Sequence, residues 1–289
     1  MKFAWIRGAL VPEFAVRDCC RVLRVSASGY YRWLKAPVSR RSERRRSLLE
    51  VICAEHVRSR CNYGSPTIHE RLAARGLHVN VKTVAQIMRA AGIRSKAVRK
   101  FRPATTQSRH GHEPAPNILG RDFSATGPDQ KWLSDITYIR TGEGFLYLTC
   151  VMDAWSRSIV GWSMSDTLHS TAVIDAIGMA FARRRPGAGL VFHSDRGVQF
   201  ACHACRDLLA ARGVVQSMSR AGDCYDNAMM ESLWATLKKE LTQHETYATR
   251  ADARAAVFEW IEVWYQRERS HSSLGYLSPE AFEAARRAS

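Results

Sequence analysis

Residues 130–164, QKWLSDITYIRTGEGFLYLTCVMDAWSRSIVGWSM, contain three runs rich in aromatic and β-branched side chains. Turn residues such as TGEG separate the runs, so the stretch predicts three consecutive β-strands. Further along the chain, helix-like segments alternate with short apolar strands in the order STAVIDAIGMAFARRR, GLVFHSD, ACHACRDLLAARG and VVQSMS, and two more helices follow. Three adjacent strands followed by such an alternation predict an α/β fold, with a mixed sheet flanked by helices.

The composition places the chain among globular proteins. It has 289 residues, of which 46% are hydrophobic, enough for a packed core and for more than one domain. No apolar run reaches the length of a membrane span, and the start, MKFAWIRGALVPEF, lacks the long uncharged stretch of a secretory signal. We therefore expect a soluble cytoplasmic protein with no membrane partner.

Eight cysteines are scattered along the chain, mostly in apolar or helical contexts. In a chain of this length that distribution does not indicate a disulfide scaffold. Cys202 and Cys205 form a single CxxC pair, and one pair without a second is weak evidence for zinc. We interpret them as buried free thiols, although the sequence leaves a metal role open.

Positive charge is concentrated in the first two-fifths of the chain. Residues 1–112 hold 24 Lys or Arg against 6 Asp or Glu, whereas residues 113–289 hold 19 against 21. The whole formal net charge of +16 therefore belongs to the first part. Such a basic region is typical of a surface that binds nucleic acid. The alternative, a merely solvated cationic surface, does not explain the asymmetry.

The basic part also shows a pattern of short helices. Two are expected within residues 13–35, and after the run SRRSERRRS the segments LLEVICAEHVRSR, SPTIHERLAARG and VNVKTVAQIMRAAG form three more. Pro66 suits a helix start, Gly76 a helix end, and Asn80 the N-cap of the last helix. Three such helices with tight turns predict a helix-turn-helix unit, with residues 80–91 as recognition helix. An ordinary small helical bundle is the alternative.

These patterns divide the chain into four parts. Residues 1–38 form an N-terminal helical segment, 39–93 the helix-turn-helix domain, 94–117 a basic linker, and 118–289 the α/β core with its C-terminal helices. The cations expected to contact DNA phosphates are Arg44, Arg45, Arg46, Lys82, Lys96, Arg99, Lys100, Arg102 and, on the core, Lys238. For Lys238 an ordinary solvated lysine is an equal alternative.

Three carboxylates lie at the ends of predicted elements of the core. Asp135 lies in the first strand, Asp195 directly follows the strand LVFHS, and Glu231 lies on the helix AMMESLWATLKKEL among large apolar side chains. Taken singly, each acid has an ordinary structural role, as a turn cap, an Asx-turn or a helix-surface residue. The central first strand and a parallel strand beside it would bring Asp135 and Asp195 together, with Glu231 packed across them.

Crowded carboxylates repel one another, and a shared divalent cation removes that penalty. Oxygen ligands of this kind suit Mg²⁺ or Mn²⁺, and two ions about 4 Å apart would serve in-line displacement at phosphorus. We therefore predict that Asp135, Asp195 and Glu231 are both the metal ligands and the catalytic residues. Asp153 is the competing fourth acid, which we interpret as a structural partner of Arg157.

The motifs WLSDIT, HSDRGVQF and YDNAMMESLWATLKKE, with 35 residues between Asp195 and Glu231, resemble those of a known family. The chain is similar to DDE transposases of the retroviral-integrase-like superfamily, in particular to the second-reading-frame (OrfB) product of two-frame bacterial insertion sequences. NYGSP and HSSLGYLSP also resemble segments of that family, so the resemblance covers nearly the whole chain. Phe200 and Gln266 depart from its common Tyr and Asn.

The resemblance implies a ribonuclease H-like integrase core and a metal-dependent DNA transposase that cleaves and transfers strands at the ends of an insertion sequence. It also implies a first-reading-frame helix-turn-helix partner joined by frameshifting, a homo-oligomer on DNA, and a location at the bacterial nucleoid. Two other functions stay open from the residues: a hydrolysis-only nuclease of the same fold, and a non-catalytic DNA-binding regulator derived from a transposase. The terminal repeats and target preference are not encoded in any recognisable motif.

Overall fold

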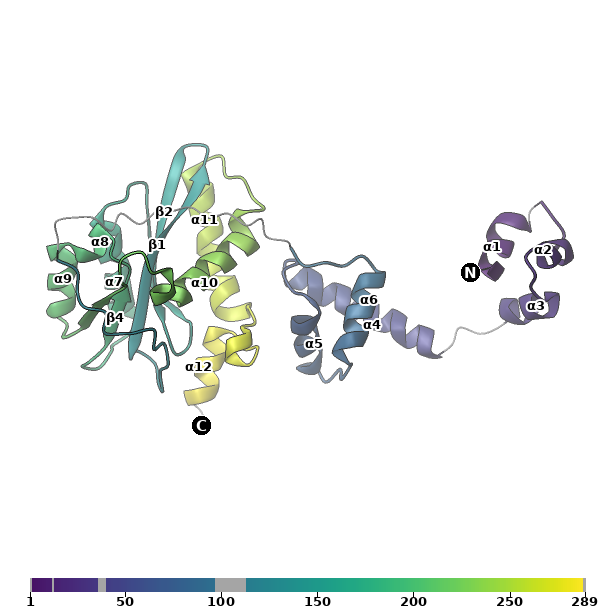
Figure 1. The fold of residues 1–289 in the computed structure, drawn as a ribbon, viewed down its shortest axis with the longest axis horizontal. Helices are drawn as coiled ribbons and strands as arrows, with labels where there is room; N and C mark the ends of the chain where they lie inside the picture. The colour runs from purple at the N-terminus through teal and green to yellow at the C-terminus, as the bar shows by residue number, and fades with distance from the viewer. Residues whose placement is uncertain (1, 12, 36–39, 97–112, 288–289) are drawn as a thin grey trace.

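The computed structural model describes residues 2–11, 13–35, 40–96 and 113–287 (Figure 1). Small helices lie at the N-terminal end, a three-helix unit follows, and an α/β core forms the rest (Figure 1). No helix among the described residues is long and apolar enough to cross a membrane. The α/β class expected from the sequence is confirmed by the sheet and its flanking helices.

The core is built on a five-stranded mixed sheet with the order β3-β2-β1-β4-β5. Its strands are β1 (Lys131–Thr141), β2 (Gly144–Asp153), β3 (Ile159–Ser165), β4 (Val191–Ser194) and β5 (Val215–Met218). The first three pair antiparallel as two hairpins, as the turn signals predict, whereas β4 joins β1, and β5 joins β4, in parallel. Strand β1 is therefore central, and its parallel neighbour ends beside Asp135.

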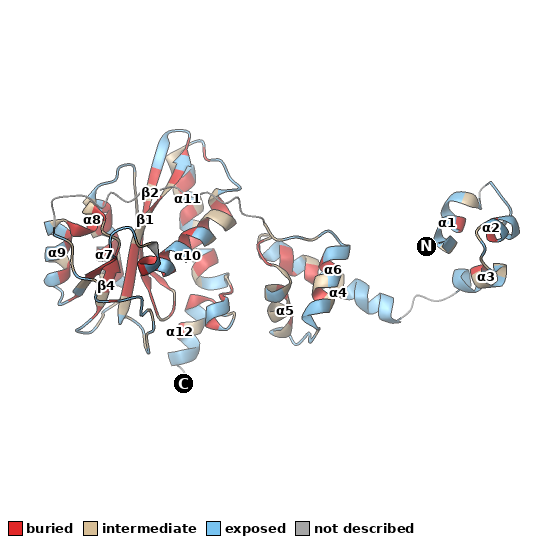
Figure 2. Cartoon of the chain, viewed as in Figure 1, coloured by how far each residue is buried: buried red, intermediate tan, exposed pale blue. Residues whose placement is uncertain are grey.

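Helices cover both faces of the sheet, so side chains that alternate along each strand are buried on either side (Figure 2). One face packs against α7 (Ser170–Arg183), α8 (Val198–Ala201) and α9 (His203–Ala210). The other packs against α10 (Ala228–Leu237), α11 (Arg250–Glu259) and the π-helical segments η3 (Lys238–Thr242) and η4 (Trp260–Glu268). The short η5 (Ser272–Leu274) and α12 (Pro279–Arg287) complete the core.

The helix-turn-helix prediction corresponds to α4 (Arg40–Arg58), α5 (Ser65–Ala73) and α6 (Val81–Ala90). Pro66 lies in the first turn of α5, and the Asn80 side chain accepts a 2.8 Å bond from the Lys82 amide at the start of α6. The apolar face of α6 is buried at Val84, Ile87 and Met88, whereas Ala91 at its C-terminal end is exposed. The predicted helix start at Pro66 and the predicted N-cap at Asn80 are therefore confirmed.

The first 35 residues form their own small cluster around Ile6, Cys19, Cys20 and Tyr30. Its helices are α1 (Lys2–Trp5), the π-helical η1 (Ile6–Leu10), α2 (Val16–Val22) and α3 (Ala27–Lys35). The last two match the pair expected from the sequence, whereas α1 and η1 were not predicted. In Figure 1 this cluster lies apart from the rest of the chain.

The helix-turn-helix unit packs directly against the core. The Tyr63 hydroxyl accepts a 2.7 Å bond from the Ser270 amide, and the Tyr63 ring lies 5.9 Å from that of Trp264. The Arg60 guanidinium stacks 4.9 Å from the same indole and pairs with Glu259. Both units therefore contribute to one continuous hydrophobic cluster, which the separate domains predicted from sequence did not anticipate.

Part of the predicted linker also belongs to the core. Asn117 donates a 2.9 Å bond to Asp226, and the Met218 amide donates to the Pro116 carbonyl, which lies beside β5. Residues 113–117 therefore pack on the sheet edge. Of the rest of the predicted linker, residues 97–112 lie outside the described residues.

Candidate active site

Asp135 and Asp195 lie side by side at the junction of two parallel strands. Ser134 of β1 is the register partner of Ser194 of β4, and the residue that follows each of these serines in the chain is one of the two acids. The Asp195 carboxylate accepts a 2.9 Å bond from the Gly197 amide, which turns the chain away after β4. The sequence expectation that a parallel strand pair brings these acids together is met by this register.

Helix α10 packs across β1 and carries the third acid. The Asn227 side chain donates to the Ser134 carbonyl at 3.2 Å, and the Trp234 indole donates to Asp135 Oδ2 at 2.8 Å. Glu231 lies one turn before Trp234 on the same helix. The sequence analysis missed the role of Trp234, although an indole one turn from a predicted catalytic acid was a visible signal.

Glu231 itself is exposed, in contrast to the apolar setting that its neighbours suggested. Met229, Met230, Leu233 and Trp234 are all buried against the sheet and the flanking helices, whereas Glu231 lies on the solvent-exposed part of α10. The acid is therefore available from solvent at the edge of the site.

Electrostatics links the three acids. Burial, together with the nearby negative charges of Asp195 and Glu231, raises the pKa of Asp135 to about 8. The bonds from Trp234 and from the Ile136 amide act in the opposite direction, since they stabilise the ionised carboxylate. The structure therefore brings Asp135, Asp195 and Glu231 within electrostatic reach of one another. Their catalytic role stays a prediction.

The donor set suits a hard divalent cation. All three candidate ligands are carboxylates, and oxygen ligands of this kind are those that Mg²⁺ prefers. Within the described parts of the chain, no three Asp, Glu, His or Cys side chains are already grouped closely enough to hold a metal ion. The acids thus fit a cation by type and position, and their side chains would have to converge to bind it.

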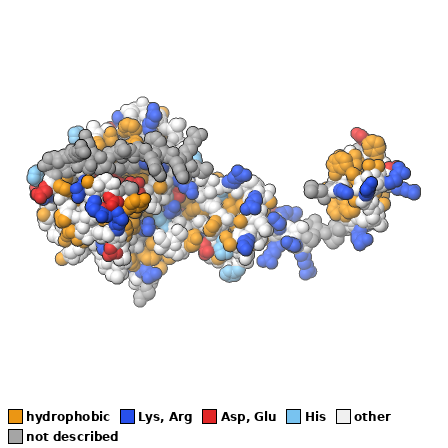
Figure 3. Space-filling view, in the orientation of Figure 1, with side chains coloured by type: hydrophobic (Ala, Val, Ile, Leu, Met, Phe, Trp, Pro, Cys, Tyr) orange, Lys and Arg blue, Asp and Glu red, His pale blue; other side chains and the backbone are white. Residues whose placement is uncertain are grey.

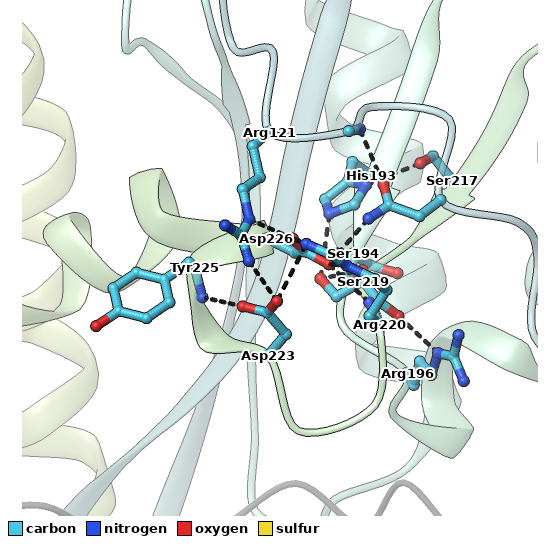
Figure 4. Close-up of polar contacts among 12 residues, drawn as sticks. Arg121, His193, Ser194, Arg196, Ser217, Ser219, Arg220, Asp223, Tyr225 and Asp226 are labelled. Atoms are coloured by element: carbon cyan, nitrogen blue, oxygen red, sulfur yellow. Dashed lines mark hydrogen bonds and ion pairs between the residues drawn. The ribbon is translucent and has the colours of Figure 1, made fainter.

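A network of ion pairs holds the loop that leads into α10 (Figure 4). The Asp226 carboxylate is fully buried and accepts bonds from Arg220 and Arg121, each at 2.8 Å, and from Asn117. These partners hold the pKa of Asp226 well below its usual range, with the Arg220 bond as the largest cause. Asp223 pairs with the same two arginines.

Asp226 and Asn227 directly precede α10, where residues of their type commonly cap a helix, but neither caps α10 through its side chain. Asn227 occupies the N-cap position but makes no side-chain cap bond, because its amide reaches the Ser134 carbonyl of β1 instead. Asp226 is engaged by the two arginines. Both residues therefore place the helix through tertiary contacts rather than through a local cap.

Two other polar residues near the acids are structural. His193 is buried between the hydroxyls of Ser217 and Ser219, at 2.9 and 3.1 Å, and burial lowers its pKa to about 4 (Figure 4). These two bonds join β4 to the end of β5, and neither of them involves Asp195. Asp153 accepts from the amides of Asp129 and Ser156, so it supports a turn, as expected, but through these residues rather than the Arg157 side chain.

The CxxC pair consists of free thiols. Cys205 is fully buried, which raises its pKa to about 12, and the Cys202 thiol donates to the Gln199 carbonyl. Neither belongs to a metal-binding group among the described residues. The predicted burial holds for Cys205, whereas Cys202 is only partly buried.

The predicted DNA contacts differ in their availability. Arg44, Arg45 and Arg46 are exposed on the N-terminal half of α4, where Figure 3 shows Lys and Arg side chains gathered, and Lys82 is exposed at the start of α6. Lys238 is half-buried just after α10. Arg99, Lys100 and Arg102 lie outside the described residues.

Lys96 needs a correction. Its ammonium donates a 3.1 Å bond to the Glu240 carbonyl, and its amide donates to the Cys61 carbonyl. The residue is half-buried and joins the helix-turn-helix unit to the core. A lysine engaged in this way is not the phosphate contact that the basic linker pattern indicated.

Comparison with known proteins decides the family. Models of the integrase core domain match residues 125–224 and 212–279, and a model of an HTH-like domain matches residues 43–101. The transposase InsF for insertion sequence IS3A of Escherichia coli (strain K12) is 44% identical over 285 residues, which is 98% of each chain. The chain belongs to the IS3 transposase family. The transposase is also 41% identical to an uncharacterized 31 kDa protein of insertion element IS600 from Shigella sonnei, over 91% of this chain and 96% of that protein.

Solved integrase cores are more distant from the transposase. The HTLV-2 integrase catalytic core in complex with magnesium has a TM-score of 0.39 and 15% identity, covering 50% of this chain and 90% of that one. The BIV integrase core has a TM-score of 0.42 and 15% identity, covering 55% and 97%. The predicted class, an integrase core preceded by a helix-turn-helix region, is confirmed by the family models and the mixed sheet. The chain is a DNA transposase.

Proposed function

We propose that Asp135, Asp195 and Glu231 carry the metal-dependent cleavage and strand transfer of this transposase. The observation that supports the proposal is the arrangement of the elements: the β1–β4 register sets Asp135 beside Asp195, and α10, which carries Glu231, is bonded to β1 through Asn227 and Trp234. Carboxylates placed together repel one another, and a shared divalent cation removes that repulsion. The acids would hold Mg²⁺ or Mn²⁺, as two ions in the active state.

The protein's own groups prepare the acids for this task. Trp234 and the Gly197 amide each hold one oxygen, of Asp135 and Asp195 respectively, and so limit the rotation of both carboxylates. Each carboxylate oxygen has a second lone pair, so these bonds do not prevent metal coordination. Glu231, exposed on α10, would complete the ligand set by turning toward the strand ends.

A divalent cation bound there would polarise the scissile phosphodiester and activate a water or a terminal 3′-hydroxyl for in-line displacement. The Asp135, Asp195 and Glu231 carboxylates would fix where that phosphodiester is placed. Because the nucleophile comes from water or DNA, the reaction requires no covalent bond to a protein side chain.

The proposed division of labour follows the units of the chain. The helix-turn-helix unit, residues 39–93, would bind the element ends through the exposed cations of α4 and α6, and residues 118–289 would perform the chemistry. Two ends must be processed together, so we propose a homo-oligomer on DNA, acting at the nucleoid. We also propose a first-reading-frame helix-turn-helix product, joined by frameshifting, as partner for end recognition.

A strand-transfer assay with pre-cut 3′-hydroxyl ends tests the proposal. The wild type with Mg²⁺ should join labelled ends to target DNA, and Asp195→Asn should bind DNA equally well but neither nick nor join it. Nicking without joining would favour a hydrolysis-only nuclease. Unchanged activity of Asp195→Asn would remove the acid from the mechanism, and DNA binding without any nicking by the wild type would indicate a non-catalytic regulator.

A further inference from the structure

A polar cavity lies between the helix-turn-helix unit and the core, beside α10. Its volume is about 390 Å³, and its lining comes from three separated segments: the turn around Asn62 and Tyr63, the α10–η3 helix, and residues 269–273. A cavity of this size lies within the range of small-ligand sites. The cavity is not lined by any of the three candidate catalytic acids, although Ser232, directly after Glu231, lines it.

Three residues that line the cavity have buried polar atoms with no hydrogen-bond partner among the residues that the structure describes. The unpaired atoms are the amide nitrogen and amide oxygen of Asn62, the Ser270 hydroxyl oxygen and His271 Nε2. Each of the three residues is at most 6% exposed. An unpaired buried polar atom costs about 1–3 kcal/mol, so proteins rarely retain several at one place without a use. All three border the same space, which indicates a ligand with hydrogen-bonding groups.

The tautomer of His271 decides whether its Nε2 donates or accepts a hydrogen bond in the cavity. The Arg269 guanidinium lies 3.3 Å from His271 Nδ1, and because a guanidinium only donates, Nδ1 must accept. Nε2 then carries the proton and is a donor toward the cavity. Together with the Asn62 amide, which both donates and accepts, it can recognise the edge of a planar polar group.

The cavity is positively charged. Arg157, Lys239 and Arg269 line it, and its one acid, Glu240, is already bonded to Arg269 at 2.9 Å. Two cations, Arg157 and Lys239, therefore have no ion pair among the described residues and face the same space. This excess of charge favours an anion such as a phosphate ester.

One wall of the cavity is apolar. Met152, Met229 and Leu233 line it, together with the buried Tyr265. A phosphate alone would leave this wall unused, and an apolar ligand would leave the cations and amides unused. A nucleotide has a charged phosphate, a base with a flat apolar face, and a hydrogen-bonding edge, so it fits all three kinds of wall.

We propose that this cavity binds one unpaired nucleotide of the DNA strand that α10 presents to the acids, with its phosphate toward Arg157 and Lys239 and its base edge toward Asn62 and His271. The proposal rests on the proposed function only in that DNA lies along α10. A base in a duplex could not reach side chains that are at least nine-tenths buried, so the strand has to be unpaired at that point. Binding therefore couples strand opening to contact between the helix-turn-helix unit and the core.

DNA binding without metal tests this site separately from catalysis. In EDTA, the full-length protein is titrated with a labelled blunt duplex and with the same duplex carrying a short single-stranded overhang. The wild type should bind the overhang form about tenfold more tightly. Asn62→Asp, which replaces the amide that donates to the base edge with a carboxylate that only accepts, and His271→Gln should each remove most of that preference and leave blunt-duplex affinity unchanged.

The exposed Arg140→Gln, which also changes the charge by one, is the matched control and should keep the preference. Equal binding of both DNA forms by the wild type, or unchanged preference in both cavity variants, would overturn the proposal. A wild type whose overhang preference is abolished by millimolar free deoxynucleotide but which makes no crosslink to the strand would indicate a free-nucleotide site and would overturn it as well.

Photocrosslinking keeps the proposal testable even if a variant fails to fold. An overhang carrying 5-iododeoxyuridine should crosslink the wild-type protein to a peptide containing Tyr63 or Tyr265, which line the cavity. Crosslinks confined to peptides of α4 or α6 would contradict the site. Because no metal is present, either result leaves the role of the three acids to be decided by the strand-transfer assay.

Discussion

The indole of Trp234 on α10 donates a 2.8 Å hydrogen bond to Asp135 on β1, across 99 residues of sequence. This bond joins the helix that carries Glu231 to the strand that carries the first acid. It fixes one carboxylate oxygen, and it offsets part of the burial that raises the pKa of Asp135. The geometry of the candidate site therefore depends on an aromatic residue that is not itself an acid.

Trp234→Phe should lower strand-transfer activity while the fold is kept. The substitution retains the aromatic packing of a buried residue but removes the donor, and a hydrogen bond to a charged group contributes about 1.5–3 kcal/mol. We expect a loss of roughly 10- to 100-fold in a single-turnover assay. Trp162→Phe, which removes the 2.6 Å indole bond to Glu262 and lies two strands away from Asp135, is the matched control and should lose little. Equal losses in both variants would point to general destabilisation.

Asp226→Asn should destabilise the transposase. The fully buried Asp226 balances Arg220 and Arg121, and removal of its charge leaves both guanidinium groups without their strongest partner. Because those arginines are about half exposed, we expect a loss of about 2–3 kcal/mol in the free energy of unfolding by urea at pH 7. Asp223→Asn, at the rim of the same network, should cost less.

The same variant predicts a pH dependence. The folded pKa of Asp226 is depressed, so its contribution is present above the unfolded pKa of about 3.9 and declines as pH falls below it. The gap in stability between the wild type and Asp226→Asn should therefore be constant from pH 7 to 5 and shrink toward pH 3. A gap that widens on acidification would contradict this assignment.

His271 should make the fold sensitive to mild acid. Burial, together with the positive charges of Arg269 and Arg157, lowers its pKa from 6.5 to about 3, and the Tyr265 ring packs against it at 4.8 Å. The unfolded chain takes up the proton below pH 6.5, and the folded protein does so only near pH 3, so stability declines through that window. His271 lowers the free energy of unfolding by about 1.4 kcal/mol for each pH unit below 6.5. Between pH 6.5 and 5, the free energy of unfolding in urea should therefore fall by about 2 kcal/mol less in His271→Gln than in the wild type. An unchanged profile would show that His271 is not the titrating group.

The exposed arginines of α4 should set part of the salt dependence of DNA binding. Each phosphate neutralised by a cation adds about 0.9 to the slope of log affinity against log salt concentration. Replacing Arg44, Arg45 and Arg46 together by Gln should therefore reduce that slope by about 2–3 in fluorescence anisotropy titrations of the full chain. Arg140→Gln should leave the slope nearly unchanged, and a triple variant with the wild-type slope would exclude these arginines as contacts.

Much of the architecture was predictable because its signals are local. The runs of residues 130–164 have the alternation and turn residues of a β-meander, and Pro66 and Asn80 mark helix starts through bonds that span only a few residues. The candidate acids could also be chosen from the sequence, because Asp135 and Glu231 lie within predictable elements and Asp195 directly follows one. Contacts such as that between Tyr63 and Ser270 were not, since they join residues 207 positions apart.

The sequence by itself determined the order of elements and the basic N-terminal part, and it supplied the three candidate acids, because periodicity, charge and motif spacing are properties of short stretches of chain. Only the tertiary structure decided how those parts meet. Packing exposes Glu231, directs Asn227 to a strand carbonyl instead of a cap, engages Lys96 internally, and leaves unpaired polar groups around one cavity. The physical reason is that burial and pairing depend on neighbours brought together by folding, which no local pattern specifies.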